Sequence, residues 1–318
     1  MELKLLSSIY RRLIQEEWQG LPFGLRNGRI GLMTFMALYY EFTHNGKAHD
    51  LTGKILQNVQ KERMAHNATL MNGNLGLAWT LDLFKKKGLI EHDTSLKNLQ
   101  GTIFLDFMRN HYHSPISLTV EDGLFSAGIY TLMQLPDNDS YERYSVEERI
   151  ISMIDECERQ LNQSIKGFFC PEKLGLAALN SYMYFLKTCA DKRIFPYKAD
   201  LLLSRVHDLY CMLEEKPACD NFVYNYLKSP GRALIHPTNT NSQLLEVLGD
   251  IGFYSLLYGL PKMFLQALRQ ISMPQKDFLL LTIRTMVQNS LTNKTLYGLG
   301  YGLMLNTEIE CQLRHDQA

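Results

Sequence analysis

The chain has 318 residues, of which 46% are hydrophobic and 11% aromatic, so it is large enough to bury a substantial core. Its 33 lysines and arginines balance its 33 aspartates and glutamates, which argues against a surface that coats nucleic acid or a strongly anionic partner. The N-terminus lacks the residue order of a secretory signal, no run approaches the roughly 18 apolar residues of a membrane span, and the cysteines form no CxxC pair, so we expect a cytoplasmic protein.

Most of the chain shows the periodicity of one-sided helices. Apolar residues recur at helical spacing in the segments 51–59, 96–107, 146–161, 202–213 and 278–286. We expect the first helix at about 3–18 and the last at about 302–313. Ser145 and Glu148 have the spacing of a capping box, which predicts a helix start at Ser145. Strand signals are weak, and the sequence therefore predicts an all-α protein.

A glycine-rich stretch returns ahead of one apolar segment after another. The last glycines of the six stretches are Gly31, Gly76, Gly128, Gly175, Gly252 and Gly302. Three stretches contain a GxxG pair, and these pairs are Gly28–Gly31, Gly73–Gly76 and Gly249–Gly252. The successive spacings are 45, 52, 47, 77 and 50 residues. A period of about 45–50 residues is the size of one helical hairpin with its loops, and the 77-residue gap has room for one degenerate unit. Residues 216–246 do not follow the pattern and form an irregular insertion or a degenerate repeat.

Each unit consists of an amphipathic helix, a glycine loop and a more apolar helix, which predicts two concentric layers. We therefore expect a single domain over 1–318, an (α/α) toroid of six or seven hairpins. Glycine permits close backbone approach and positive φ where the inner helices converge. Parallel inner helices would direct their free N–H groups at a central mouth suited to an anion, a carboxylate or a thiolate. The alternative is that the glycines serve only helix packing.

The recurring glycine loops, from Gly24 to about Leu305, resemble those of the lanthionine synthetase C-like family. The resemblance implies an (α/α) toroid that takes part in the maturation of ribosomally made peptides. Catalytic members close thioether rings by adding a cysteine thiol to a dehydrated serine or threonine. A zinc ion held by two cysteines and a histidine activates that thiol.

The residues at the matching positions depart from the family's pattern. Val247 or Leu248 stands where the first zinc cysteine belongs, and Leu296 and Tyr297 stand where the Cys-His pair belongs. The stretch from Cys170 to Gly175 lacks the histidine that active members carry. The family's acidic residue matches Glu121 or Asp122. Because aliphatic and phenolic side chains do not replace zinc ligands, the comparison predicts a member without a cofactor.

Several other residues are candidates for chemistry. His207 and Cys211 lie four residues apart on a predicted helix, with Cys219 eight residues further on, and they form either a metal site or an ordinary helix face. His111 and His113 follow a predicted helix end and suit a cationic cap better than a ligand pair.

Other candidates lie near the expected mouth. Cys170 precedes a glycine loop, where a helix N-terminus can activate a thiol. Carboxylates at the mouth either do acid–base work, as in toroid glycosidases, or complement helix dipoles. These carboxylates are Glu121, Asp122, Glu172 and Asp250. The expected aromatic lining consists of Phe23, Phe125, Phe169, Tyr297 and Tyr301.

Three functions follow from these patterns. The first is a zinc-free scaffold that binds a precursor peptide or its modifying enzyme. The second is an active peptide cyclase that uses a relocated metal site or Cys170. The third is a toroid carbohydrate-active enzyme that uses the carboxylates.

Overall fold

The structure is a computed structural model that describes residues 2–62, 69–90, 124–135, 141–165, 176–235, 240–271 and 291–315. Within these ranges all regular structure is helical, as the sequence predicts. The helices are α1 (Glu2–Leu13), η1 (Trp18–Gly20), α2 (Arg29–Thr43), α3 (Gly46–Glu62), α4 (Asn74–Lys86), α6 (Leu124–Met133), α7 (Tyr141–Ile165), α8 (Leu176–Asp191), α9 (Pro196–Met212), α10 (Ala218–Lys228), η4 (Pro230–Arg232), α11 (Asn241–Leu257), α12 (Pro261–Arg269) and α14 (Asn293–His315).

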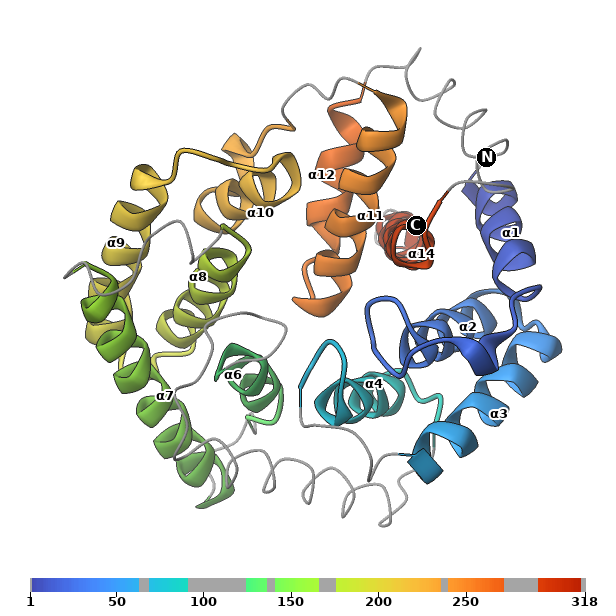
Figure 1. Cartoon of the computed structure of the whole chain (residues 1–318), viewed down its shortest axis with the longest axis horizontal. Coiled ribbons are helices and arrows are strands. Elements are labelled where there is room, and N and C mark those ends of the chain that lie inside the picture. Colours follow the sequence, from blue (N-terminus) through green and yellow to red (C-terminus); the bar gives the residue numbers. More distant parts are fainter. Residues whose placement is uncertain are drawn as a thin grey trace.

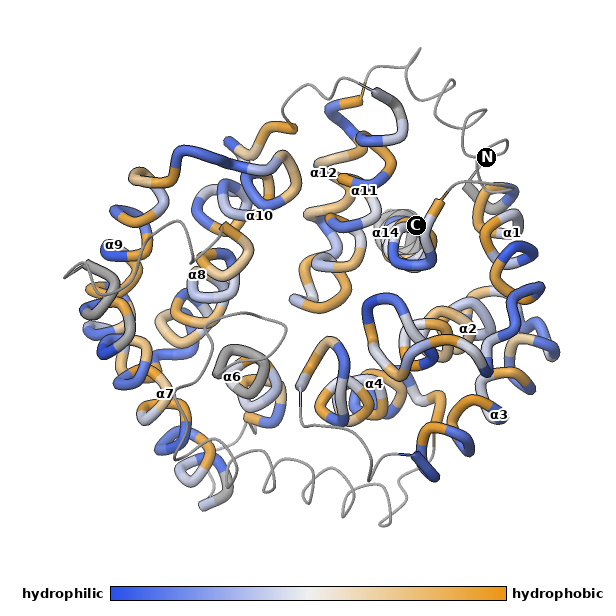
Figure 2. The backbone as a smooth tube through the Cα atoms, viewed as in Figure 1, coloured by the Kyte–Doolittle hydropathy of each residue, from blue (hydrophilic) through white to orange (hydrophobic). Residues whose placement is uncertain are grey.

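Two kinds of helix differ in how much of their surface they bury. Eleven of the 15 residues of α2 and ten of the 16 residues of α8 are buried, whereas α3 buries only Ala48, Ile55 and Val59. Those three residues share one face of the helix, because they are spaced by seven and four positions. Figure 2 shows hydrophilic segments recurring along α3, α7 and α9. The amphipathic and apolar helices inferred from the sequence are therefore distinct elements.

The more buried helices form a continuous series of neighbours. In chain order α2, α4, α6, α8, α10, α11 and α14 each contact the next, and α14 also contacts α2. Figure 1 shows α3, α7 and α9 outside this series. Two bonds align α7 with α9: Lys198 Nζ donates to Asp155 Oδ1 at 2.6 Å, and Arg205 Nη1 donates to Asn162 Oδ1. The second bond lies further along both helices than the first, so the two outer helices run parallel.

Some helix boundaries differ from the expected ones. Ser145 lies inside α7, which begins at Tyr141, and so it is not an N-cap. An ion pair of 2.8 Å between Arg143 Nε and Glu147 Oε1, one turn apart, supports the helix across Ser145. The first helix ends at Leu13 and the last begins at Asn293. The expected helices 96–107 and 278–286 lie outside the described residues, and α10 occupies part of the irregular segment 216–246.

Two of the glycine pairs do open helices, in the same manner. Gly28 is the N-cap of α2 and Gly73 is the N-cap of α4, both in extended conformation with φ of −123° and −137°. A Cβ on Gly31 would collide with the carbonyl oxygen of Leu25, and one on Gly76 with that of Leu70, six residues earlier in both cases. Close approach, and not positive φ, is therefore what these loops require of glycine.

The carbonyl groups of the first loop already occupy the N-terminus of α2. Arg29 N donates to Pro22 O at 2.7 Å, and the next two N–H groups donate to the carbonyls of Phe23 and Gly24 at 3.2 Å. In the second loop Gly76 N donates to Thr69 O at 3.4 Å, which is the same seven-residue separation as between Arg29 and Pro22. The expected ring of free N–H groups is therefore wrong at α2, because the loop itself satisfies the first turn.

The third pair, Gly249 and Gly252, lies in the middle of α11 and opens no helix. The N-cap of α11 is Thr240, whose hydroxyl accepts from Gln243 N at 3.2 Å. A Cβ on Gly252 would collide with the carbonyl of Gly298 in α14. Gly302 likewise lies within α14, and a Cβ there would overlap the ring of Phe264. At these sites the alternative interpretation, glycine for helix packing, is confirmed.

Candidate functional site

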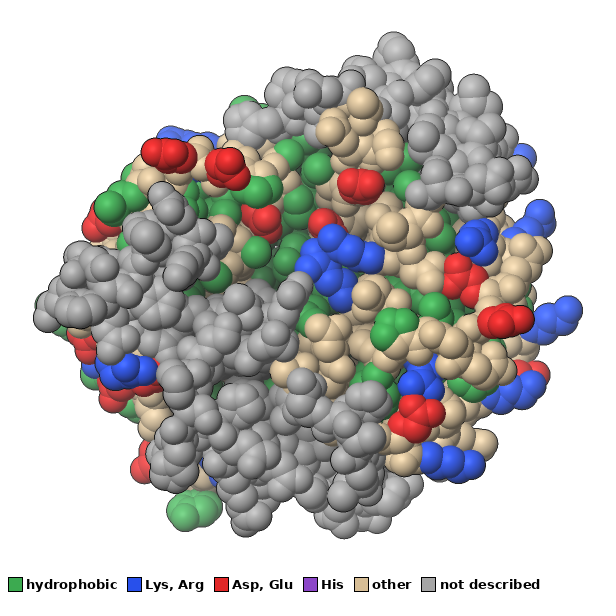
Figure 3. Space-filling view, in the orientation of Figure 1, with side chains coloured by type: hydrophobic (Ala, Val, Ile, Leu, Met, Phe, Trp, Pro, Cys, Tyr) green, Lys and Arg blue, Asp and Glu red, His purple; other side chains and the backbone are tan. Residues whose placement is uncertain are grey.

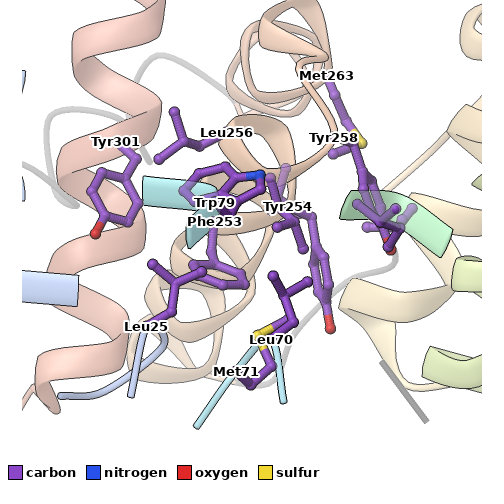
Figure 4. Close-up of a cluster of buried hydrophobic side chains, with 14 of the residues drawn as sticks. Leu25, Leu70, Met71, Trp79, Phe253, Tyr254, Leu256, Tyr258, Met263 and Tyr301 are labelled. Atoms are coloured by element: carbon purple, nitrogen blue, oxygen red, sulfur yellow. The ribbon is translucent and has the colours of Figure 1, made fainter. Parts of the chain in front are cut away.

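The space between the first two glycine loops and α11 is filled by side chains. Figure 4 shows Leu25 and Met71 from the loops close to Phe253 of α11, and all three side chains are buried. The loops are joined directly, because Leu25 N donates to Met71 O at 2.7 Å. A wide central cavity is therefore not present between these elements.

Next to this core lies a cluster of charged side chains from three elements. Asp250, in α11, accepts from Lys294 of α14 at 2.8 and 2.9 Å and from Arg26 Nη2 at 3.2 Å. The side chains of Arg26, Asp250 and Lys294 are 19%, 20% and 35% exposed, so the cluster reaches solvent. Figure 3 shows basic and acidic side chains beside hydrophobic ones in a hollow near the centre of one face. Arg26, Asp250 and Lys294, together with Asp220 of α10 and Asn180 of α8, which are described next, are called the central polar cluster.

Asp220 lies in the first turn of α10 and is the second carboxylate of the cluster. The side-chain amide of Asn180, in α8, donates to its backbone carbonyl at 3.0 Å and lies 3.5 Å from its Oδ1. Burial first, and then the charge of Asp250, raise the pKa of Asp220 to about 6, against the opposing effects of Arg26 and Lys294. The cluster thus holds two carboxyl groups in different environments, since Asp250 has two cationic partners.

A neighbouring thiol shares this environment. Cys219 is buried, and its pKa is raised by burial first and then by the charges of Asp250 and Asp220. A thiol held in its protonated form is a poor nucleophile. Cys219 therefore belongs to the wall of the cluster and not to its reactive groups.

Aromatic rings complete the wall. The Arg26 guanidinium lies 5.8 Å from the ring centre of Tyr254 and 5.9 Å from that of Phe253. Tyr258 stacks on Tyr184 with ring centres 4.1 Å apart, and Tyr254 follows Tyr258 at 5.6 Å. Guanidinium–ring contacts hold the charged group in place at low entropic cost.

The aromatic side chains expected at the mouth lie elsewhere. Tyr297 and Tyr301 are 0% exposed and Phe23 is also buried, so these three belong to the core. Tyr301 donates to the carbonyl of Gly31 at 2.8 Å. The other expected lining residues, Phe125 and Phe169, are not among the side chains that the structure describes. The expected aromatic lining is therefore wrong for the three described rings, because helix packing encloses them.

The positions that the resemblance assigns to zinc ligands are packed. Leu248, Leu296 and Tyr297 are buried and Val247 packs against the core. None of these side chains supplies a thiolate, imidazole or carboxylate, so the residues at these positions do not fit a zinc ion. Asp250 and Lys294 lie two to three residues from them and form an ion pair in the same region.

His207 and Cys211 do share one face of α9, as predicted. The sulfur lies 3.8 Å from His207 Nε2, and Lys228 Nζ lies 2.9 Å from the same nitrogen. Tyr224 is 3.1 Å from His207 Nδ1. Cys219 lies in the wall of the central polar cluster and is not a third ligand. A lysine ammonium against the imidazole opposes a second cation there. No group of three or more His, Cys, Asp or Glu side chains placed to hold a metal occurs in the part of the chain described.

Several predicted residues cannot be placed. The candidates Glu121, Asp122, Cys170, Glu172, Gly175, His111 and His113 lie outside the described residues. Gly128 is buried in α6, where a Cβ would overlap the ring of Phe185. Of the expected mouth carboxylates the structure therefore places only Asp250. The acid–base alternative that needs the others stays a prediction.

The sequence pattern pointed to Asp250 but missed its partners. Arg26 lies inside a glycine loop, and Lys294 precedes the last glycine stretch. Asp220 lies in the segment 216–246, which does not follow the repeat pattern. A cation between two loop glycines was the only signal available for Arg26. Asp220 and Asn180 join the cluster through the contact of α8 with α10, which no local pattern predicts.

Comparisons of the chain with protein-family models, with curated proteins and with solved structures find no match. Among the described helices, none combines the length and apolar character needed to cross a membrane.

Proposed function

We propose that the chain is an (α/α) toroid, similar to the lanthionine synthetase C-like family, that binds a ribosomally made peptide during its maturation in the cytoplasm. The observation that carries the proposal is the closed series of neighbours from α2 to α14 and back to α2, with the central polar cluster beside it. Binding, and not thioether chemistry, fits the packed residues at the zinc-ligand positions.

The cluster has the composition of a peptide-binding site. Arg26, Asp250 and Lys294 offer charged donors and acceptors at partial exposure, and the ring of Tyr254 lies beside them. Peptide backbones and termini require both donors and acceptors, and aromatic walls supply apolar contact area. The described free thiols Cys157, Cys189, Cys211 and Cys219 agree with a reducing compartment.

The test uses two fluorescein-labelled model peptides, one with a dehydroalanine ahead of a cysteine and one with serine in its place. Fluorescence anisotropy measures binding, and loss of free thiol measures ring closure, with and without added zinc. We expect dissociation constants of about 1–100 μM for the labelled peptides and ring closure at the rate of buffer alone.

Asp250→Ala should weaken binding about tenfold, because it leaves two cations without their shared partner. Asp200→Ala is the matched control, since Asp200 is exposed on α9, and it should change nothing. Failure of both peptides to bind would overturn the scaffold. Zinc-dependent ring closure would replace it with an active cyclase.

A further inference from the structure

The two carboxylates of the central polar cluster have unequal partners. Asp250 is held by Lys294 and Arg26 at 2.8 and 3.2 Å. Asp220 forms no ion pair with any residue that the structure describes, and its side chain has only the amide of Asn180 within hydrogen-bond reach. Asp220 is therefore the carboxylate with acceptor capacity to spare.

The side-chain oxygen of Asn180 is a second, independent indication that a ligand donor binds here. Its side chain is 1% exposed, and its Oδ1 has no hydrogen-bond partner in the described part of the protein. Its Nδ2 already donates to Asp220, so the amide is fixed against that residue. Buried acceptors without a donor are rare and costly, and a ligand N–H placed between Asn180 and Asp220 would satisfy this one.

The electrostatics favour a cation as that donor. The charge of Asp250 raises the pKa of Asp220 more than either Arg26 or Lys294 lowers it. With Asp220 ionised, the two carboxylates equal the two cations in number, and both cations are held on Asp250. A ligand cation beside Asp220 meets a half-buried carboxylate that has no cation of its own.

The groups around this position come from α8, α11, α14, the first glycine loop and α10 itself. They are Asn180 and Tyr184 of α8, Asp250, Tyr254 and Tyr258 of α11, Lys294 of α14, Arg26 of the first glycine loop, and Cys219 of α10 itself. The tyrosines are held neutral by burial, which raises the pKa of each. Stacked rings next to a carboxylate suit an ammonium group.

We propose that Asp220 and Asn180 bind a primary ammonium group, carried by the peptide as its amino terminus or as a lysine side chain. An ammonium has three donors and no acceptor, which matches a carboxylate whose one donor is the Asn180 amide and an amide oxygen that has none. The proposal rests on the proposed function in that the peptide supplies the ammonium.

The first probe is n-butylammonium, with n-butanol as the uncharged control, in saturation-transfer NMR titrations. We expect the amine to bind and the alcohol not to bind. Lowering the pH from 7.5 to 5.0 should weaken amine binding about tenfold, because Asp220 becomes protonated through its pKa of about 6 while the amine stays charged. Asp220→Asn should weaken binding about tenfold at pH 7.5 and remove the pH dependence. Asp200→Asn should leave both unchanged.

Two further variants should change the amine affinity in opposite directions if the ammonium binds at Asp220 and Asn180. Asn180→Leu removes the unpartnered oxygen at similar volume and should weaken binding severalfold. Lys294→Met removes a repelling cation and should strengthen amine binding severalfold. Unchanged binding in Asp220→Asn, or weaker binding in Lys294→Met, would overturn the proposal even if a single variant fails to fold.

The peptide arm separates this inference from the proposed function. Each labelled peptide is compared with its amino-terminally acetylated form and with a form whose lysines are acetylated. Loss of affinity in one form identifies the source of the ammonium. Equal affinity of all forms overturns the ammonium site while the scaffold stands, and amine binding without any peptide binding overturns the scaffold while the site stands.

Discussion

Two tyrosines of α14 show how differently one residue type can serve within a single helix. Tyr297 and Tyr301 are both 0% exposed and lie four positions apart on the same face. The hydroxyl of Tyr301 donates to Gly31 O, whereas the hydroxyl of Tyr297 has no partner in the described part of the chain. Burying a hydroxyl without a partner opposes folding, and a satisfied one is about neutral or favourable.

This difference makes a prediction at the residue scale. Tyr301→Phe should lower the free energy of unfolding by about 0.5–1.5 kcal/mol, because it removes a buried hydrogen bond to the carbonyl of Gly31. Tyr297→Phe should be neutral or stabilising by up to about 1 kcal/mol, because it removes a buried unpaired group. Urea unfolding followed by circular dichroism measures both, and equal losses in the two variants would contradict the assignment.

Among the helices, the pairing of α11 with α14 depends on glycine. It is the most extensive helix–helix contact in the described part of the chain. Gly249, Gly252 and Gly298 bring the two backbones together, so a methyl group on any of them would meet backbone atoms of the other helix. Backbones do not yield as flexible side chains do, and the two helices would have to separate.

Gly252→Ala should therefore lower the free energy of unfolding by at least about 2 kcal/mol. The matched control is Gly53→Ala in α3, where nothing lies within 4 Å of the added Cβ. There the substitution should raise stability by about 0.5–1 kcal/mol, since alanine favours a helix interior over glycine. Denaturant midpoints of the two variants and the parent measure the contrast. A stabilising effect at Gly252 would show that the two backbones can separate freely.

At the scale of the whole molecule, the central polar cluster joins segments that are far apart in the chain. Arg26 and Asp250 are 224 positions apart, and Asn180 and Asp220 are 40 apart. The contact of α14 with α2 closes the series of neighbours at its two ends. The cluster therefore exists only when the whole fold is assembled, and its protonation is coupled to unfolding.

Protonation of Asp220 stabilises the folded state. Folding raises the pKa of Asp220 from 3.8 to about 6, so the folded state holds the proton more tightly than the unfolded state. The resulting stabilisation is complete below about pH 4 and is lost as the pH rises through 6. Because Asp220 is partly exposed, we expect a loss of about 1–2 kcal/mol between pH 4.5 and pH 7.5 from this group.

Asp220→Asn should accordingly raise the free energy of unfolding at pH 7.5 and reduce its change between pH 4.5 and 7.5, relative to the parent. Asp200→Asn, at an exposed position of α9, is the control and should follow the parent at both pH values. Urea titrations at the two pH values provide the measurement. Such a gain at a charged site fits a group retained for binding and not for stability.

Repeat spacing and one-sided periodicity were sufficient to predict the helical class, the outer character of α3 and α9, and the loops that open α2 and α4. These features are local, because they depend on residues within one or two turns of each other. The same local reasoning misread Gly249 and Ser145, since a glycine pair or a capping box has the same sequence whether it opens a helix or lies within one.

The sequence by itself determined that the chain forms helices of two kinds and that Asp250 belongs near a polar site. Periodicity and residue type are local properties that can be read from neighbouring residues. Only the tertiary structure decided which residues meet Asp250, which glycines serve backbone contact, and that Tyr297 and Tyr301 are core residues. The physical reason is that these properties depend on which helix faces come into contact, and such contacts arise from packing between segments that are distant in sequence.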